Sequence, residues 1–230
     1  MQIEDNIAIG MKPVYYNAAA KGDIEGFENI PKPLNQLLTP NRNTILHIYL
    51  SSLIKRSEDS ESSTAFIEEI LSTCPLLLSQ PSVKRETPLH IAARYGHDTM
   101  VKVLIEHAKA FQGDLENGVN NAVKKMLEKT NNEKNTALHE AIHNNHLDVV
   151  KQLIEEGPDF SYSCNDADET PLYLAVERGF EKVMDHILDK CKSPAHDGPL
   201  CRTTLHAALI WDNQGNAYLF FFNIPACIVE

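Results

Sequence analysis

The chain has 230 residues, of which 43% are hydrophobic, and its 32 acidic against 21 basic residues give a formal net charge of −11 at pH 7. The hydrophobic content excludes an intrinsically disordered chain. The acidic balance disfavours phosphate backbones, so we expect no nucleic acid among the partners. The five cysteines are odd in number and form no C-x-x-C pair, which argues against a disulfide framework or a cysteine-based zinc site and is typical of a reducing compartment.

The first part of the chain begins with an acidic stretch, residues 1–5. It lacks the basic region and long apolar run of a secretory signal, so none is expected. Residues 15–23 then read Tyr-Tyr-Asn-Ala-Ala-Ala-Lys-Gly-Asp. A repeated unit, described below, carries alanines and a glycine after a Thr-Pro-Leu-His sequence. This segment has the alanines and the glycine but lacks Thr-Pro-Leu-His. We interpret it as a degenerate first repeat, because terminal repeats are often atypical.

The recurring unit begins with a Thr-x-x-His pattern. Copies occur at residues 44–47, 87–90, 136–139, 170–173 (with tyrosine in place of histidine) and 203–206. The last three copies follow one another at intervals of 34 and 33 residues. A T-P-L-H-x-A pattern with a period of about 33 residues is the signature of the ankyrin repeat. We therefore predict an all-α ankyrin-repeat solenoid of about five to six stacked helix–turn–helix units with β-hairpin tips.

The repeat frame, meaning the positions of the repeats set by the Thr-x-x-His copies, assigns residues 1–211 to the array and leaves residues 212–230 as an apolar tail outside the repeats. The repeats are expected near residues 13–42, 43–85, 86–134, 135–168 and 169–201, with a partial repeat at 202–211.

Each full repeat is expected to carry a second helix with apolar residues at helical spacing. The pattern predicts such helices over residues 98–111, 147–156 and 180–190. Gly96 should end the preceding helix of the third repeat in a left-handed conformation. Asn145 stands at the equivalent place in the fourth repeat, and asparagine tolerates that conformation.

Two intervals exceed the period and predict insertions on one side of the array. The first excess, residues 51–63, is rich in serine and acidic residues and is interpreted as a solvated loop. The second lies between His107 and Thr130. Residues 119–127 within it have a helical apolar pattern, which predicts either a longer outer helix or an extra one.

The last residues do not continue the repeat. After residues 205–211 a second helix is expected, but the tail contains Gly215, an aromatic run and Pro225. An incomplete last repeat would leave an apolar end open to association. The longest apolar stretch, residues 217–229, is interrupted and shorter than the ~20 residues of a spanning helix, so we expect no transmembrane span in this chain.

One motif suggests catalysis. His139-Glu140-Ala141-Ile142-His143 matches H-E-x-x-H, the zinc-binding motif of metallopeptidases. However, His139 is the frame histidine of its repeat and is expected to point into the stack near Thr136. The helix would have only about two turns, and no third ligand follows. With neither a G-x-S-x-G elbow nor a phosphate-binding loop in the sequence, we expect no enzymatic activity, no metal and no cofactor.

Ankyrin arrays bind other macromolecules along a concave face made of hairpin tips and exposed positions of the inner helices. The frame places twelve candidate partner-binding residues on this face: Lys84, Glu86, Arg94, Tyr95, Glu133, Asn135, His143, Asn144, Asp166, Glu169, Glu177 and Arg178. Tyrosine and arginine are frequent energetic anchors of interfaces. Arg85, Lys134 and Asp168 replace the glycine of the hairpin position, so the tips are expected to differ from the consensus turn.

Several segments together resemble plant ankyrin proteins of the accelerated-cell-death type over residues 13–211. They are the Tyr-x-Ala-Ala-x-x-Gly-Asp opening, the insertion after the third repeat, and residues 135–141, 168–173, 193–196 and 202–208. The resemblance implies a cytosolic ankyrin array followed by several membrane-spanning helices, on the cytosolic face of the plasma membrane or endoplasmic reticulum. It also implies a role in defence and cell-death signalling.

Three hypotheses follow. The favoured one is a cytoplasmic protein-interaction scaffold or regulator of defence or cell death, with other proteins as partners. The second is a truncated or alternatively spliced fragment that associates with itself or with a full-length family member. The third, a zinc peptidase through residues 139–143, is the least favoured.

Overall fold

The computed structural model describes residues 10–27, 30, 32–53, 61–110, 120–158, 163–191, 195, 198–201, 203–204 and 206–207. The regular elements within these residues are helical. The α-helices are α1 (Pro13–Lys21), α2 (Ile45–Leu53), α3 (Glu61–Thr73), α4 (Pro88–Tyr95), α5 (Asp98–Ala110), α6 (Asn120–Leu127), α7 (Ala137–His143), α8 (Leu147–Glu156), α9 (Pro171–Glu177) and α10 (Glu181–Lys190). Short 3₁₀ turns are η1 (Glu25–Phe27), η2 (Leu34–Gln36), η3 (Pro75–Leu78) and η4 (Pro199–Cys201).

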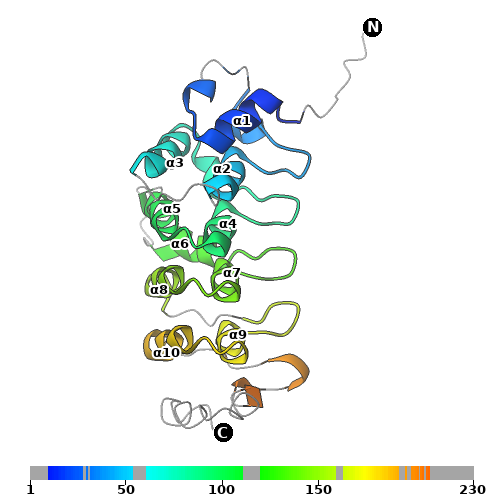
Figure 1. Ribbon diagram of the computed structural model, residues 1–230, viewed down its shortest axis with the longest axis vertical. Coiled ribbons are helices and arrows are strands. Elements are labelled where there is room, and N and C mark those ends of the chain that lie inside the picture. Colours follow the sequence, from blue (N-terminus) through cyan, green and yellow to red (C-terminus); the bar gives the residue numbers. More distant parts are fainter. Residues whose placement is uncertain are drawn as a thin grey trace.

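The helices stack in two columns (Figure 1). The inner column contains α1, α2, α4, α7 and α9, each in contact with the next, and the outer column contains α3, α5, α8 and α10. Hairpin loops project from the inner column on the side away from the outer helices (Figure 1). The core lies between the columns, where small Ala92 and Ala93 of α4 are fully buried and let neighbouring helices approach. This is the helical stack that the sequence predicts.

Three of the inner helices, α2, α4 and α7, begin at a reciprocal hydrogen-bonded cap. In α4, Thr87 is the N-cap, and its backbone N–H donates to Nδ1 of His90 over 3.2 Å, while its Oγ1 lies 2.8 Å from the same nitrogen. Thr44 with His47 and Thr136 with His139 repeat this geometry. The threonine and histidine of the repeat thus satisfy the exposed donors of each helix start.

The same histidines join each repeat to the next. Nε2 of His47 lies 2.8 Å from the carbonyl oxygen of Glu86, and Nε2 of His90 lies 3.1 Å from that of Asn135. The carbonyl of Glu169 receives the third of these bonds, from His139. Because Nδ1 accepts from a backbone N–H, the proton must sit on Nε2, which donates to the carbonyl. Each imidazole is therefore held neutral, in one tautomer, between two repeats.

The left-handed ends of the inner helices are found where the frame predicts them. Gly96 has φ +72° and Asn145 has φ +57°. A Cβ at Gly96 would lie 2.4 Å from Nδ1 of His146, whose Nε2 is 3.0 Å from the carbonyl oxygen of Arg94. Gly96 is therefore needed both for its conformation and for the close approach of the next repeat.

Substituting Gly96 with alanine is expected to lower the free energy of unfolding by about 2 kcal/mol, because it adds left-handed strain and displaces the ring of His146. Chemical unfolding followed by circular dichroism measures this change. Asn145→Gly is the matched control: it changes the equivalent left-handed position and should leave stability equal or slightly higher. A Gly96→Ala variant as stable as the wild type would contradict the steric argument.

Four hairpin loops, residues 39–43, 82–86, 131–135 and 165–169, share one backbone geometry. In each loop the first N–H donates to the fifth carbonyl and the fourth N–H to the first carbonyl. The fourth residues are left-handed, with φ between +57° and +60°: Arg42, Arg85, Lys134 and Asp168. The expectation that these tips depart from a glycine-type turn is therefore wrong. Non-glycine residues adopt the left-handed conformation, at roughly 1 kcal/mol each.

The insertions differ from the prediction in extent. Both ends of the expected loop 51–63 are helical, since α2 continues to Leu53 and α3 begins at Glu61, and residues 54–60 lie outside the described residues. Ser52 Oγ donates to the carbonyl of Ala20 over 2.8 Å, and the hydroxyl of Tyr49 donates to that of Ser63 over 3.0 Å, so both helix ends are tied into the stack. In the second insertion, α6 is an extra helix packed against α5, not a prolongation of it.

Several expectations fall outside the described residues, namely Phe111, Val119, the tail 212–230 and most of the partial repeat 202–211. In the part of the chain that the structure does describe, every helix is too short or too polar to cross a lipid bilayer.

Candidate partner-binding face

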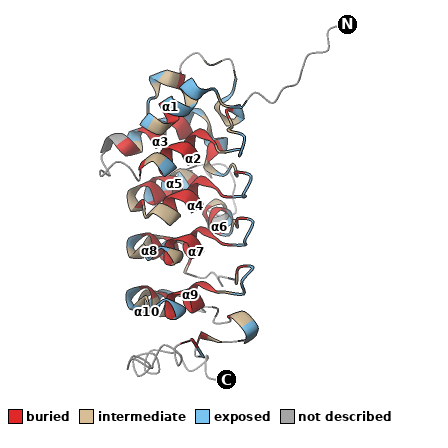
Figure 2. Cartoon of the chain, turned by 45° about the vertical axis from the view of Figure 1, so that its right-hand side comes forward, coloured by how far each residue is buried: buried red, intermediate tan, exposed pale blue. Residues whose placement is uncertain are grey.

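We call the surface made by the four hairpin loops and the exposed sides of α2, α4, α7 and α9 the hairpin face. Figure 2 shows the loop tips as exposed and the inner helices behind them as buried. The exposed tips follow from the repeat, because each five-residue loop closes on itself through two backbone bonds and ends directly before the buried threonine that starts an inner helix. The hairpin face is where the sequence places the candidate partner-binding residues.

The structure brings four of these residues together. Lys84, Glu86, Arg94 and Tyr95 line one groove of about 350 Å³ between the loops 39–43 and 82–86. Loop 39–43 contributes Asn41 and Asn43 to the groove. Helix α2 contributes His47 and Ser51, and α4 contributes Ile91. Amide, hydroxyl, cationic and aromatic groups therefore share one recess, which is the composition of a polar recognition site.

Arg94 does not point freely into this groove. It forms an ion pair with Glu86 of its own repeat, and its Nε donates to Oε2 of Glu140 in the next repeat over 2.9 Å. Only 9% and 8% of the two glutamate side chains is exposed, against 26% for Arg94. Burial opposes the charge, but hydrogen bonds to the two carboxylates outweigh it and raise the pKa of the Arg94 guanidinium. Arg94 is therefore an inter-repeat bridge.

Two candidate residues are buried, which corrects their placement on the exposed surface. The Glu86 carboxylate is buried and forms an ion pair with Arg94. The Oδ1 of Asn135 accepts from Nδ2 of Asn165 over 2.9 Å, and its Nδ2 donates to Glu133 over 3.3 Å. Both residues stand just before the threonine cap, where the loop turns into the core, so their side chains bond within the array: Glu86 to Arg94 of its own repeat, and Asn135 to Asn165 of the next loop.

The remaining candidates lie further along the same face. Exposed ones are Glu133, Asn144, Asp166, Glu177 and Arg178, and half-buried ones are His143 and Glu169, while in the groove Lys84 is exposed and Tyr95 half-buried. Arg178 donates to the carbonyl oxygen of His143 over 3.3 Å, which joins the fourth and fifth repeats. Burial, followed by the nearby positive charge of Arg178, lowers the pKa of His143. These residues form a row along the array and do not converge on one pocket.

The H-E-x-x-H motif is occupied by structural hydrogen bonds. Nδ1 of His139 receives the Thr136 backbone N–H, and Nε2 donates to the carbonyl of Glu169. Glu140 accepts from Arg94 and from Asn131. Burial lowers the pKa of His139 to about 4. With both ring nitrogens engaged and the glutamate neutralised, these residues do not fit a hydrolytic zinc site. No group of three or more metal-ligating side chains occurs among the described residues.

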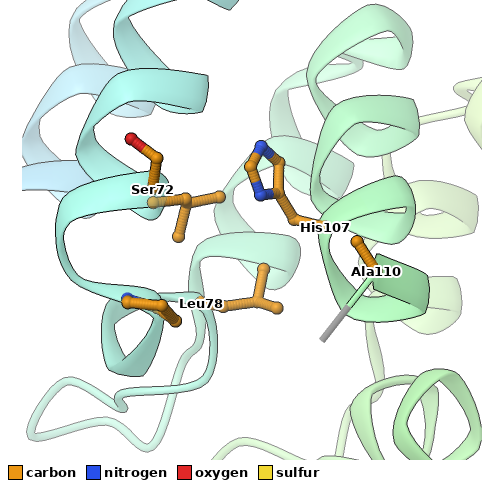
Figure 3. Close-up of a pocket in the computed structure, with 6 residues that line it drawn as sticks. Ser72, Leu78, His107 and Ala110 are labelled. Carbon is orange, nitrogen blue, oxygen red and sulfur yellow. The ribbon is translucent and has the colours of Figure 1, made fainter. Parts of the chain in front are cut away.

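Two other hollows lie away from the hairpin face. One, of about 180 Å³, lies between α3, η3 and α5 (Figure 3). Its lining is apolar except for Ser72 and His107, and the Ser72 hydroxyl donates back to the carbonyl of Glu69 over 2.8 Å. The other, of about 410 Å³, lies beside η1 and α3 and is lined mainly by apolar side chains. Neither brings together groups suited to catalysis.

The sequence prediction missed the residues contributed by the loop 39–43, including Asn41, Arg42 and Asn43. The signal was available, because counting back from Thr44 places these residues at the same loop positions as 84–86. Val83, which is 54% exposed at the groove edge, was also missed.

Comparison with known proteins supports this architecture. The family pattern described as "Ankyrin repeats (3 copies)" matches residues 60–162 and 115–197, more than half of the chain. The match confirms the predicted ankyrin solenoid. It also gives the two-column stack its expected role, since ankyrin repeats serve in protein–protein interaction.

Three relatives span different shares of the chain. The protein Accelerated Cell Death 6 of Arabidopsis thaliana is 26% identical over 216 residues, which cover 92% of this chain and 30% of that protein. Palmitoyltransferase AKR1 of Lachancea kluyveri is 24% identical over 205 residues, covering 87% and 24%. Alpha-latrocrustotoxin-Lt1a of Latrodectus tredecimguttatus is 34% identical over 96 residues, covering 42% and 6%.

The first of these relatives confirms the resemblance to the accelerated-cell-death type that the motifs indicate. The chain spans less than a third of the length of each relative.

Proposed function

Because the chain belongs to the family of ankyrin-repeat proteins, we propose that it is an interaction module that binds partner proteins on its hairpin face. The observation that carries this proposal is the groove between the loops 39–43 and 82–86, where Asn41, Lys84 and Tyr95 present polar and aromatic groups beside exposed loop tips. Exposed polar side chains around an aromatic group are typical of recognition surfaces.

The biological setting is proposed from the relative that covers most of the chain. Its name refers to accelerated cell death, and we infer a role in plant defence or cell-death signalling, with the array exposed to the cytosol on the face of a membrane. The chain is proposed to act by binding and not by catalysis. The palmitoyltransferase similarity supports no transferase activity here, because it covers 24% of that enzyme and coincides with the repeats.

A charge-reversal pair tests the assignment of the face. We expect Lys84→Glu combined with Arg178→Glu to abolish specific capture of proteins from plant-cell extract, because both side chains are exposed on the hairpin face. Quantitative mass spectrometry of the captured proteins is the measurement, and circular dichroism verifies that helical content is unchanged.

The control carries the same change of charge on the outer column, Lys102→Glu with Lys182→Glu, at exposed positions of α5 and α10. Proteins captured by the wild type and this control, and lost from the hairpin-face variant, would support the proposal. Equal loss from both variants would show that net charge and not the face controls capture, and would overturn it.

A further inference from the structure

The fourth residue of each hairpin loop is an exposed charged residue in a conformation that favours glycine. Arg42, Arg85, Lys134 and Asp168 all have positive φ and all are exposed. Glycine at these positions would relieve the backbone without loss of any buried contact. Strain retained at an exposed position, four times at the same place in the repeat, points to a use for the side chains outside the fold.

The charge of these tips changes along the array. The first two loops carry Arg42 and the pair Lys84 and Arg85, although the chain as a whole is strongly acidic. The third carries Lys134, which pairs with Asp166 over 2.7 Å. The fourth is acidic, with Asp166, Asp168 and Glu169.

Among the ion pairs found within the described residues, none involves Arg42, Lys84 or Arg85. We call Arg42, Lys84, Arg85 and Lys134 the basic edge. Its first three cations are open to a partner.

The basic edge has a fixed spacing. Backbone N–H groups of Val83 and Asn132 donate to the carbonyls of Asn41 and Lys84, both over 2.9 Å, so each loop is bonded to the one before it. Packed helices lie about 8–10 Å apart, and the tips inherit that interval. A peptide in the extended polyproline II conformation rises about 3.1 Å per residue with three residues per turn, so every third side chain lies on one face and would meet a successive tip.

We propose that the basic edge binds an extended acidic segment of a partner protein, with a carboxylate at about every third residue. This inference rests on the proposed function and names the chemistry of its partner. The carboxylates meet Arg42, Arg85 and Lys134 in turn, while the adjoining groove offers the amides of Asn41 and Asn43 to the peptide backbone. The acidic fourth loop repels the segment beyond that point, which limits it to about seven residues and fixes its position.

A peptide titration with the full chain tests this proposal. The probe is a fluorescein-labelled nine-residue peptide with glutamate at positions 2, 5 and 8 and serine or threonine elsewhere. The control peptide is identical except that glutamine replaces the three glutamates. Fluorescence anisotropy at 50 and 150 mM salt gives the affinities. We expect the glutamate peptide to bind at least about fivefold more tightly than the glutamine peptide, with the difference shrinking as salt rises.

The variant Arg42→Gly with Arg85→Gly separates binding from folding. It should weaken binding of the glutamate peptide at least about fivefold, and at the same time raise Tm by about 2–4 °C per substitution, because strain is removed. A gain in stability rules out misfolding as the reason for lost binding. Asp168→Gly is the matched control: it should raise Tm in the same way and leave affinity for the glutamate peptide unchanged or higher.

Three results would overturn the proposal: equal affinity for the two peptides, unchanged affinity in the double variant, or tighter binding of an eight-nucleotide oligothymidine than of the glutamate peptide. The last would assign the edge to a phosphate ligand. Failure here is distinct from failure of the proposed function. If capture from extract still depends on Lys84 and Arg178 while the glutamate peptide does not bind, the hairpin face remains an interaction surface and only its acidic specificity is wrong.

Discussion

Replacing Arg94 with alanine should lower the free energy of unfolding by about 3 kcal/mol, the range seen when one partner of a buried charge cluster is removed. The substitution leaves the carboxylates of Glu86 and Glu140 buried side by side without their cation. Because these glutamates belong to adjacent repeats, the loss acts on the contact between repeats and not on one helix alone. Chemical unfolding at neutral pH measures the change.

A second substitution separates charge from packing. Combining Arg94→Ala with Glu140→Gln removes one of the two stranded charges, so the double variant should regain part of the lost stability, and a double-mutant cycle measures the coupling. Arg178→Ala, at an exposed arginine of the same face, should change stability by less than about 0.5 kcal/mol. If Arg94→Ala matched Arg178→Ala, the inter-repeat bridge would contribute nothing measurable. For the same reason Arg94 is a poor probe of partner binding, since its loss disturbs the array.

Acidification is expected to destabilise the array through its inter-repeat histidines. Burial lowers the pKa of His90 and of His139 to about 4, from 6.5 in the unfolded chain. Between these values the unfolded state binds protons that the folded state does not, so the stability present above pH 6.5 is lost as pH falls toward 4. For the two histidines together the loss between pH 6.5 and 5 is about 3 kcal/mol. Burial also lowers the pKa of His47, which acts in the same direction.

Unfolding curves recorded at several pH values measure this slope. The double variant His90→Gln with His139→Gln should be less stable than the wild type at pH 7.5, because it weakens two bonds between repeats, yet lose less stability between pH 6.5 and 5. Asn165→Ala, which removes a bond between repeats without removing a histidine, is the control: it should be less stable at pH 7.5 and keep the wild-type slope. A slope unchanged in the double variant would show that other groups control the acid response.

Much of the fold could be predicted because the repeat is encoded locally. Thr87, His90 and Gly96 each define a feature of a single helix: its cap, the bond to the next loop and its left-handed end. Those features recur at one spacing, so a pattern read in one repeat predicts the others. Helices α5, α8 and α10 begin and end within a residue of the expected positions for the same reason.

The candidate site was harder to predict because its side chains pair across repeats. Whether Glu86 faces solvent or an arginine depends on Arg94 and on Glu140, which is 46 residues further along the chain than Arg94. The burial of Asn135 likewise depends on Asn165 of the next loop. Counting positions within the repeat places all of these residues on one face. Whether a given side chain is exposed or bonded to another repeat depends on the distance between stacked repeats, which the sequence of a single repeat does not encode.

The unequal length of the repeats bears on how such a chain can change over evolutionary time. Backbone bonds join Asn41 to Val83, Lys84 to Asn132, and Glu133 to Asp166, so the loops stay in step although 42, 48 and 33 residues separate their partners. The described part of the added length, α6, packs against α5 of the outer column. Insertions can therefore lengthen the outer side of the array during evolution, while the hairpin loops on the inner side keep the same spacing and the same contacts from loop to loop.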